Sequence, residues 1–518
     1  MSQQWQPISN MDRAIPPEIW NKILDLVDFD LLLDMRTSSR YLKEIAEGHY
    51  VFSRDIDLDT SDNTLLFARR CEAAMTTHGR TLNLNIDLSF GKDDSTDDLI
   101  AVSDPNREFQ RAAFISDVVT IVLRVQDIVR HLRIIIGEEH FHLLRDIFQQ
   151  AAPKLESFHL STTGADTPEL PGYMFLGQAP QLTSLALNDV SFAQTSAEQM
   201  SLPSVRSLTY ISADKLHLPL GFGVLVPGLK SLVFAASEWT STELSSVDDS
   251  RLAFGVALEH LTFDFSLPGE NKRLCHLLGP GAHLVQEIFM SAYSDDESNF
   301  DSFKTLVADL KGPVSLTLGL EQYGSIEMTV TERTDQGRQG RLRTLRIDLD
   351  AVIHAVIQNT YDLEDACDEL DLVLGLLDDL ASSKTVTELR INIAAGSNFI
   401  SECLKRLPEA KALVLSAYDG KYSDWLQPCG IRWQLPGGSS NSSDVTRLAN
   451  VKLVRVVACD IADDAAGPRD CDLDAVTALI QIMPRKPLPL EISDSASGAV
   501  TERFSALPTI ASKVSRID

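Results

Sequence analysis

The feature of the sequence that most constrains its fold is a short pattern that returns along the chain. Each copy has apolar positions spaced as LxxLxL, and several copies begin with a small or apolar residue and a proline. The copies with proline are APKLESFHL (152–160), APQLTSLAL (179–187), LPSVRSLTY (202–210), VPGLKSLVF (226–234) and LPEAKALVL (407–415). The copies without proline are VRHLRI (129–134), LEHLTF (258–263), LRTLRI (342–347), VTELRI (386–391) and VKLVRV (451–456). A chain made of such units buries its apolar positions by stacking one unit on the next.

The spacing of the copies resembles that of leucine-rich repeats, in which each unit supplies a strand and a helix or irregular return. From Val129 to Leu258 the first apolar positions are separated by 26, 27, 23, 24 and 29 residues. Proline ends the preceding helix and is tolerated where a strand begins. The resemblance implies an α/β fold with an irregular leucine-rich-repeat-like solenoid and a curved parallel sheet over 129–500. Before it, 53–128 is expected to hold a connecting segment and the first irregular repeats, and 501–518 is expected to be a C-terminal tail.

Between the LxxLxL copies the apolar period changes to that of a helix. The patterns predict helices over 63–75, 140–150 and 361–380, and a strand over 81–90. The segment 361–380 has acidic residues on one face and apolar residues at steps of four and three. We interpret it as a helix on the outside of the solenoid, because the pattern is too short for a coiled coil.

The segment IPPEIWNKILDLVDFDLLLDMRTSSR, residues 15–40, is unusually apolar for its size. Pro16 and Pro17 suit the first turn of a helix, and Glu18 favours the positive end of the helix dipole. The segment is therefore expected to form short helices. About 40 residues rarely bury enough surface to be stable alone, so part of this apolar set should meet another surface.

The order of these residues resembles the F-box, over roughly 12–52. An apolar-Pro-x-Glu opening is followed by an apolar helix, then by DLLLDMR (30–36) and a Ser-Arg pair at 39–40. The resemblance implies a short three-helix domain that docks a Skp-type adaptor and, through it, a cullin. The residues expected to supply the apolar centre of that dock are Pro16, Ile19, Leu24, Leu31, Leu32 and Met35. The alternative is an ordinary helical cap on the core of the next domain.

Composition and motifs exclude several classes of function. The formal net charge of −28 disfavours nonspecific binding to nucleic acid or anionic membranes. Seven scattered cysteines, the absence of a secretory signal and the absence of a long apolar run predict a cytoplasmic or nuclear protein. No nucleotide-binding or hydrolase motif is present, and His140 with His142 has no third metal ligand nearby in the sequence. We therefore expect neither an enzyme nor a cofactor nor a metal site.

The two resemblances together imply a substrate-recognition subunit of a cullin-RING (SCF-type) ubiquitin ligase. In this hypothesis the solenoid binds an unknown protein target. The alternative is a non-catalytic leucine-rich-repeat scaffold that does not act in ubiquitin transfer.

The residues between the apolar positions of each LxxLxL copy are expected to face outward, because side chains alternate along a strand. In the early copies they are small or neutral: Ser157, His159, Ser184, Ala186, Ser207, Thr209, Ser231 and Val233. In the later copies arginines appear, within and after RTDQGRQGRLRTLR (333–346). Arginine binds carboxylates and phosphates well, so Arg343, Arg346, Arg390 and Arg455 are candidate target-binding residues. The alternative is a solvated loop whose arginines balance nearby acidic residues.

Overall fold

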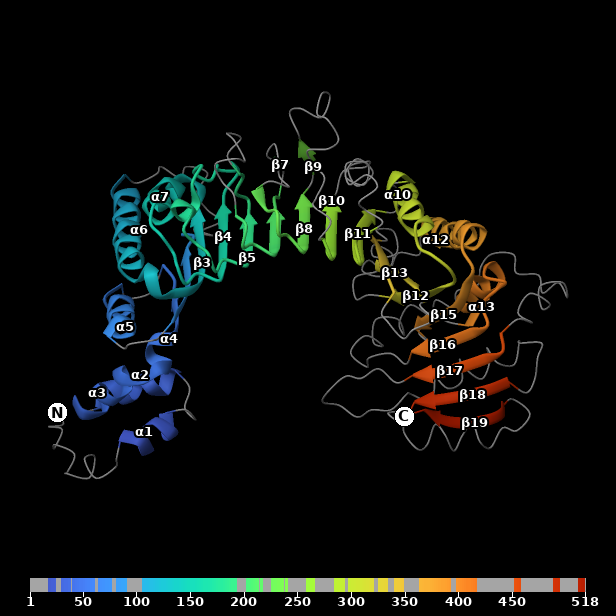
Figure 1. Cartoon of the computed structure of the whole chain (residues 1–518), viewed down its shortest axis with the longest axis horizontal. Coiled ribbons are helices and arrows are strands. Elements are labelled where there is room, and N and C mark those ends of the chain that lie inside the picture. Colours follow the sequence, from blue (N-terminus) through green and yellow to red (C-terminus); the bar gives the residue numbers. More distant parts are fainter. Residues whose placement is uncertain are drawn as a thin grey trace. The chain divides into compact units, whose positions relative to one another are not determined.

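The computed structural model shows a mixed α/β protein with a large, mostly parallel sheet (Figure 1). The structure describes residues 17–24, 29–38, 40–60, 64–76, 81–90, 105–192, 202–213, 215–217, 225–236, 238–240, 258–265, 284–293, 297–320, 325–333, 340–348, 363–392, 397–416, 451–457, 488–493 and 511–517. The chain divides into two compact units, Met1–Ala257 and Leu258–Asp518, which we call unit 1 and unit 2.

The sheet of unit 1 is built from parallel strands that neighbour one another in chain order. These strands are β1 (Asp55–Leu58), β2 (Leu82–Leu88), β3 (Val129–Gly137), β4 (Ser157–Thr163), β5 (Ser184–Asn188), β6 (Ser207–Ile211) and β8 (Ser231–Ala236). A separate parallel pair is formed by β7 (Lys215–His217) and β9 (Glu238–Thr240). The described residues thus place strands at the predicted segment 81–90 and at the early LxxLxL copies.

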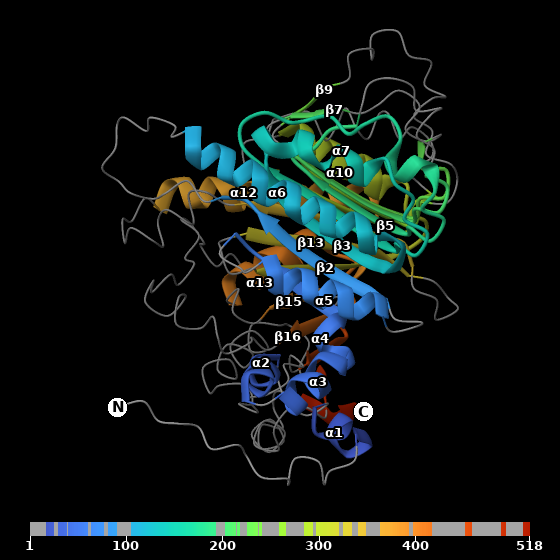
Figure 2. The same cartoon turned by 90° about the vertical axis from the view of Figure 1, so that its left-hand side faces the viewer.

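Helices cover one face of this sheet, as Figures 1 and 2 show for α5 and α6. The helical elements that follow β1 are α5 (Thr64–Thr76), α6 (Pro105–Val125), η2 (Gln126–Ile128), η3 (Glu138–Leu144), α7 (Arg145–Phe148) and η4 (Met174–Gly177). The predicted helix over 63–75 corresponds to α5. The segment predicted to be helical over 140–150 is split between the 3₁₀ helix η3 and the short helix α7.

The core of unit 1 lies between the sheet and these helices. Along β2 and β4 buried residues alternate with more exposed ones, which places the apolar positions on the helix-covered face. Three fully buried aromatic rings, Phe148, Phe158 and Phe175, meet there with centroids 5.3 to 6.2 Å apart. The Phe158 and Phe175 rings meet edge to face, an arrangement that aromatic pairs favour.

The N-terminal residues of unit 1 form the helices α1 (Pro17–Leu24), α2 (Phe29–Ser38), α3 (Arg40–Gly48) and α4 (Tyr50–Arg54). Their core contains Leu32, Ala46 and Phe52, all fully buried. Partly buried side chains of α5 pack against the same core. An ion pair of 2.6 Å between Arg36 and Glu47 links α2 to α3. We call these helices, residues 17–54, the helical segment.

A buried arginine of α5 fastens the helical segment to the first strand. Arg70 donates a hydrogen bond from Nε to the carbonyl oxygen of Phe52 (2.8 Å) and another from Nη2 to that of Asp55 (2.5 Å). The guanidinium also lies 5.9 Å from the centre of the Phe52 ring, within cation–π range. The apolar segment near the N-terminus therefore packs partly against the α/β domain that follows it.

Unit 2 is also a sheet with helices, but three of its strands, in the middle of the sheet, lie in the reverse of their chain order. Its strands are β10 (His260–Phe265), β11 (Glu287–Tyr293), β12 (Val314–Leu320), β13 (Ser325–Glu332), β14 (Leu342–Asp348), β15 (Val386–Asn392), β16 (Ala412–Ser416), β17 (Leu453–Val457), β18 (Leu488–Ser493) and β19 (Ala511–Ile517). Its helices are α10 (Glu297–Ala308), α12 (Leu363–Ser383) and α13 (Ser397–Arg406). The predicted helix over 361–380 corresponds to α12.

The order of strands across unit 2 is β10-β11-β14-β13-β12-β15-β16-β17-β18-β19. Strand β13 is antiparallel to both β12 and β14, whereas β14 runs parallel to β11 and β12 runs parallel to β15. The strands β12, β13 and β14 thus form a three-stranded meander whose order across the sheet is the reverse of their order in the chain. A simple series of strand-helix units does not produce this arrangement. A second difference concerns 501–518, expected to be a tail: β19 lies within it and extends the sheet beside β18.

Candidate functional site

Two rows of polar side chains cross the first strands of unit 1. In the first row the strand register brings together Asp55, Asn83, His131 and Ser157 from β1 to β4. In the second row it brings together Asp57, Asn85, Arg133 and His159. These eight residues alternate with the buried apolar positions, so they lie on the face of the sheet opposite α5 and α6. We call them the polar face of unit 1.

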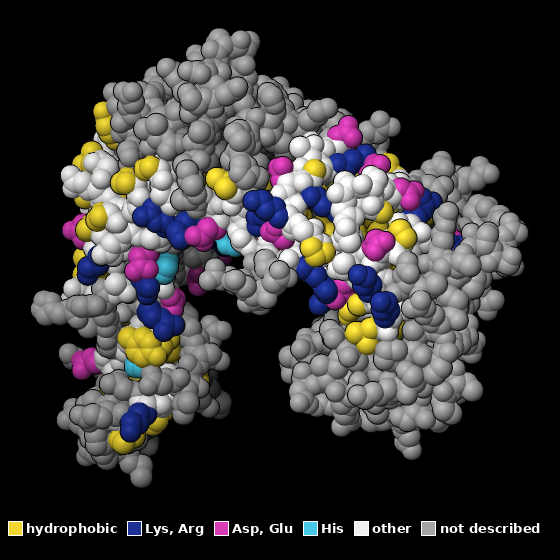
Figure 3. All heavy atoms as spheres, turned by 45° about the vertical axis from the view of Figure 1, so that its right-hand side comes forward, with side chains coloured by type: hydrophobic (Ala, Val, Ile, Leu, Met, Phe, Trp, Pro, Cys, Tyr) yellow, Lys and Arg dark blue, Asp and Glu magenta, His cyan; other side chains and the backbone are white. Residues whose placement is uncertain are grey.

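The polar face is hollowed. Its eight residues line a cavity of about 350 Å³, together with apolar residues of β1 to β3. Acidic, basic and histidine side chains lie close to one another over the N-terminal strands in Figure 3. The strand β2 holds the acidic groups in place: Asn83 donates to Asp55 (2.5 Å), and Asn85 donates to Asp57 (2.9 Å).

The positive charge of the polar face resides on Arg133. Burial, followed by the nearby Arg133 guanidinium, lowers the pKa of His159 below its usual 6.5, so this imidazole is neutral at pH 7. The amide nitrogen of Asn188 lies 3.1 Å from Nε2 of His159, which fits a neutral ring accepting a hydrogen bond. The arrangement is suited to binding: carboxylates lie on β1, a guanidinium lies on β3, and the amide groups of β2 lie between them.

The adaptor-binding residues expected from the sequence occupy two kinds of position. Ile19 and Leu31 are exposed, at 46% and 47%, and Met35 is half-buried. Leu24 and Leu32 are fully buried, so they belong to the interior of the helical segment and do not contact a partner directly. Pro16 lies outside the described residues. Ile23, which the sequence analysis did not select, is exposed on the same helix as Ile19.

Arg343 is not on the surface, which corrects its assignment as a target-binding residue. It shares a strand face with Leu345 and Ile347, both fully buried, and its own side chain is fully buried as well. Nη1 donates to the carbonyl oxygens of Leu342 (2.9 Å) and Gln286 (3.4 Å). Burial, with the neighbouring Arg341, lowers the pKa of Arg343 to about 10, so it remains charged at pH 7.

The other arginines of this region do not form one row. Arg346 pairs in register with Ser291 and Glu327, whereas Arg390 pairs with Thr317 and Val414. Arg455 pairs with Val414, so Arg390 and Arg455 share a row two strands apart. The side chain of Arg455 lies outside the described residues. The reversed strand order separates Arg346 from this row.

An acidic residue pairs with Arg390 and with Arg333 of the same arginine-rich region. Glu388, which is 5% exposed, accepts from Nε of Arg390 at 2.8 Å and forms an ion pair with Arg333. These contacts agree with the alternative given in the sequence analysis, in which the arginines balance nearby acidic residues. The side chain of Arg390 is nevertheless 53% exposed, and its charge is balanced by Glu388.

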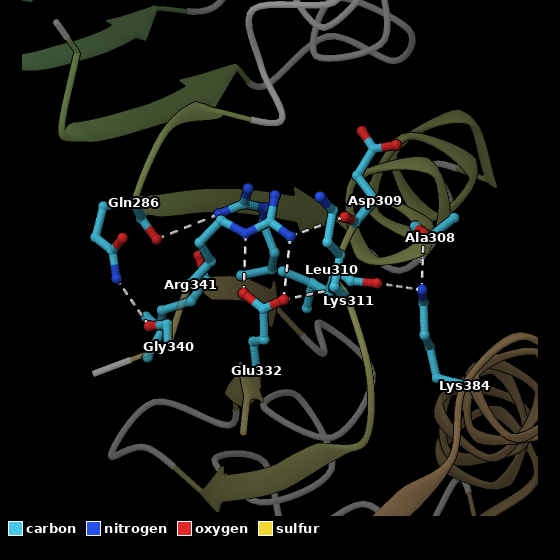
Figure 4. A network of polar contacts seen from close by, with 11 residues as sticks. Gln286, Ala308, Asp309, Leu310, Lys311, Glu332, Gly340, Arg341 and Lys384 are labelled. Carbon is cyan, nitrogen blue, oxygen red and sulfur yellow. Dashed lines mark hydrogen bonds and ion pairs between the residues drawn. The ribbon is translucent and has the colours of Figure 1, made fainter. Parts of the chain in front are cut away.

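A further network ties the inserted meander together, as Figure 4 shows. Arg341 holds Glu332 through Nε (3.0 Å) and Nη2 (3.2 Å), and it also donates to the carbonyl oxygen of Asp309 (3.0 Å). The backbone N–H of Lys311 donates to the same carboxylate (2.7 Å). The hydrogen bonds from Arg341 and Lys311 hold the pKa of Glu332 below its usual 4.5 despite its partial burial.

We expect the Glu332→Gln substitution to lower the free energy of unfolding of unit 2 by about 1.5–3 kcal/mol at pH 7, because charge-assisted hydrogen bonds are lost. Because the pKa of Glu332 is lower in the folded state, its contribution is complete above pH 4.5 and is lost as the pH falls through the folded-state value. Urea denaturation at pH 7 and at several pH values below 4.5 measures the free energy of unfolding of the variant and of the wild type. The difference between these two free energies should become smaller as the pH falls. The exposed Glu409→Gln is the matched control; a constant difference at all pH values would contradict the assignment.

The sequence analysis missed most of the polar face. Asp55 and Asp57 lie in the stretch assigned to a connecting segment and the first irregular repeats, although DIDL alternates as a strand does. Asn83 and Asn85 lie on the strand that was predicted over 81–90, but they were not selected as site residues. His131 and Arg133 lie within the VRHLRI copy, between its apolar positions. The rule that placed Ser157 and His159 outward therefore finds these residues too once it is applied to β1, β2 and β3.

Comparison with known proteins leaves the family open. No protein-family model matches the chain, and no curated protein is significantly similar to it in sequence. Within the described ranges, no helix has the length and apolar character needed to cross a membrane. Within the same ranges, no three His, Cys, Asp or Glu side chains converge as metal ligands; His140 is buried, whereas His142 is exposed.

Proposed function

We propose that the protein is the substrate-recognition subunit of a cullin-RING (SCF-type) ubiquitin ligase. The helical segment docks a Skp-type adaptor, and the sheet of the α/β domain binds the target. The single observation that carries the proposal is the exposure of the large apolar side chains Ile19, Ile23 and Leu31 on α1 and α2.

These side chains are not needed for the interior of the helical segment. That interior already contains Leu32, Ala46 and Phe52, and its connection to the sheet is made by Arg70. A helix that buries one apolar face and exposes apolar residues elsewhere has surface left for a partner. The order of residues in this segment resembles the F-box, which suggests that this partner is a Skp-type adaptor.

In this proposal the chain contributes proximity and no bond chemistry. It holds a target next to an activated ubiquitin carried by other subunits, which turns a bimolecular encounter into an effectively intramolecular one. The polar face of unit 1 is suited to the target, because it is hollowed and carries charge on exposed strand residues.

The second candidate is a leucine-rich-repeat-like scaffold that acts outside ubiquitin transfer. Affinity purification of the tagged full chain, with and without proteasome inhibition, separates the two. The receptor role predicts that adaptor and cullin both co-purify, and that ubiquitin conjugates on co-purified proteins increase under inhibition. Adaptor without cullin, or neither, would support the scaffold and contradict the receptor role.

A further inference from the structure

We propose that the polar face of unit 1 binds a polyproline-II-type segment of a protein target that carries a basic residue and an acidic residue three positions apart. The basic residue lies over Asp57, and the acidic residue lies over Arg133. The inference names the kind of segment that a target presents, and it therefore rests on the receptor role proposed above.

The second row of the polar face contains one negative and one positive charge that are left for a ligand. Asp57 is exposed, and the partner of its carboxylate is the neutral amide of Asn85. Arg133 is exposed, and its side chain has no hydrogen-bond or ion-pair partner among the residues that the structure describes. Asp55 differs, because Arg54 already neutralises it at 2.5 Å. A ligand that places opposite charges over Asp57 and Arg133 satisfies both.

The distance between the two charges selects the conformation of the ligand. Asp57 lies on β1 and Arg133 on β3, in one register row with Asn85 of β2 between them. Neighbouring strands are about 4.8 Å apart, so the two positions are separated by about 9.6 Å. A polyproline-II helix rises about 3.1 Å per residue with three residues per turn, so residues i and i+3 lie on one side about 9.3 Å apart.

Other peptide conformations fit this distance less well. In a β-strand the residues on one side are about 6.6 Å apart at i+2 and about 13 Å apart at i+4. On a helix the side chains on one face are about 5–6 Å apart at i+4 and about 10.5 Å apart at i+7. Backbone groups of a polyproline-II segment have no internal hydrogen bonds and need outside partners. The first row supplies such partners from the Asn83 amide, the His131 imidazole and the Ser157 hydroxyl.

The test uses the full chain and labelled synthetic peptides. The main probe is a proline-rich peptide with a lysine and a glutamate three positions apart. Companion peptides have the two charges two or four positions apart, or have two lysines three positions apart. Fluorescence anisotropy at low ionic strength should show the main probe binding about tenfold more tightly than its companions, since two exposed ion pairs are made together.

A charge-reversed variant tests Arg133 directly. Arg133→Glu should change the preference, so that the peptide with two lysines three positions apart binds best. The matched control is Arg145→Glu, an exposed residue on α7, which should keep the wild-type preference. Equal binding of all the peptides by the wild type, or an unchanged preference in Arg133→Glu, would overturn the inference. The peptide test does not involve the adaptor. Loss of adaptor binding alone would refute only the receptor role, and loss of peptide discrimination alone would refute only this inference.

Discussion

We expect that replacing the exposed Leu31 by Asp weakens binding of a Skp-type adaptor by about 30-fold or more, because truncating an anchor residue at the centre of an interface costs about 2 kcal/mol or more. Leu31 is 47% exposed and lies in the first turn of α2. A carboxylate is favourable at that end of a helix, so the substitution should leave α2 folded. The measurement is a titration of the full-length variant with the purified adaptor.

The control for this experiment is Leu65→Asp. Leu65 is 69% exposed and also lies in the first turn of its helix, α5, outside the helical segment. The Leu65→Asp variant should bind the adaptor as the wild type does. An equal loss of binding in both variants, or wild-type affinity in Leu31→Asp, would contradict the docking assignment.

The neighbouring Leu32 needs a separate interpretation. It is fully buried with Ala46 and Phe52, so Leu32→Ala should cost about 2–5 kcal/mol of stability through the cavity that it creates. Loss of adaptor binding in that variant would follow from unfolding of the helical segment. Changing Leu31 and Leu32 together would combine the two effects, which is why the exposed residue is the informative one.

The second large effect concerns stability. Phe158→Ala should lower the free energy of unfolding of unit 1 by about 3–5 kcal/mol, because it removes a fully buried ring from the aromatic cluster. The rings of Phe148 and Phe175 lose their shared neighbour at the same time. Urea denaturation, followed by circular dichroism, measures the change.

The matched control is Phe109→Ala on α6, where the ring is 75% exposed and the expected change is within about 0.5 kcal/mol. Phe158 occupies an apolar position of the APKLESFHL copy. A small effect at Phe158 would therefore mean that the apolar positions of the repeated pattern do not form the core.

The sequence predicted local structure better than the arrangement of strands. LxxLxL copies such as the one containing Phe158 lie on strands, because an alternating apolar pattern is a local property of the chain. The helix α12 was predicted for the same reason. The reversed order of β12, β13 and β14 was not predicted, because it depends on which distant edges pair.

The site residues show the same division. Arg343 was chosen because it belongs to the arginine-rich segment 333–346, whereas the strand buries it on the same face as Leu345. Glu388 pairs with Arg333, which is 55 positions away in the sequence. A pattern of neighbouring residues does not reveal such a pair. Asp57 and Arg133 obey the alternation rule, so they were predictable in principle. That they meet in one row required the register of β1 to β3.

The most direct test of the central claim is the binding of the purified full chain to a purified Skp-type adaptor, followed by hydrogen exchange. We expect a one-to-one complex with a Kd below about 1 µM, as a specific interface of ordinary size would give. New protection from exchange should appear in residues 17–48, while β4 to β8 should be unaffected. No complex at adaptor concentrations of about 100 µM, or protection confined to the sheet, would contradict the assignment of the helical segment as the adaptor dock.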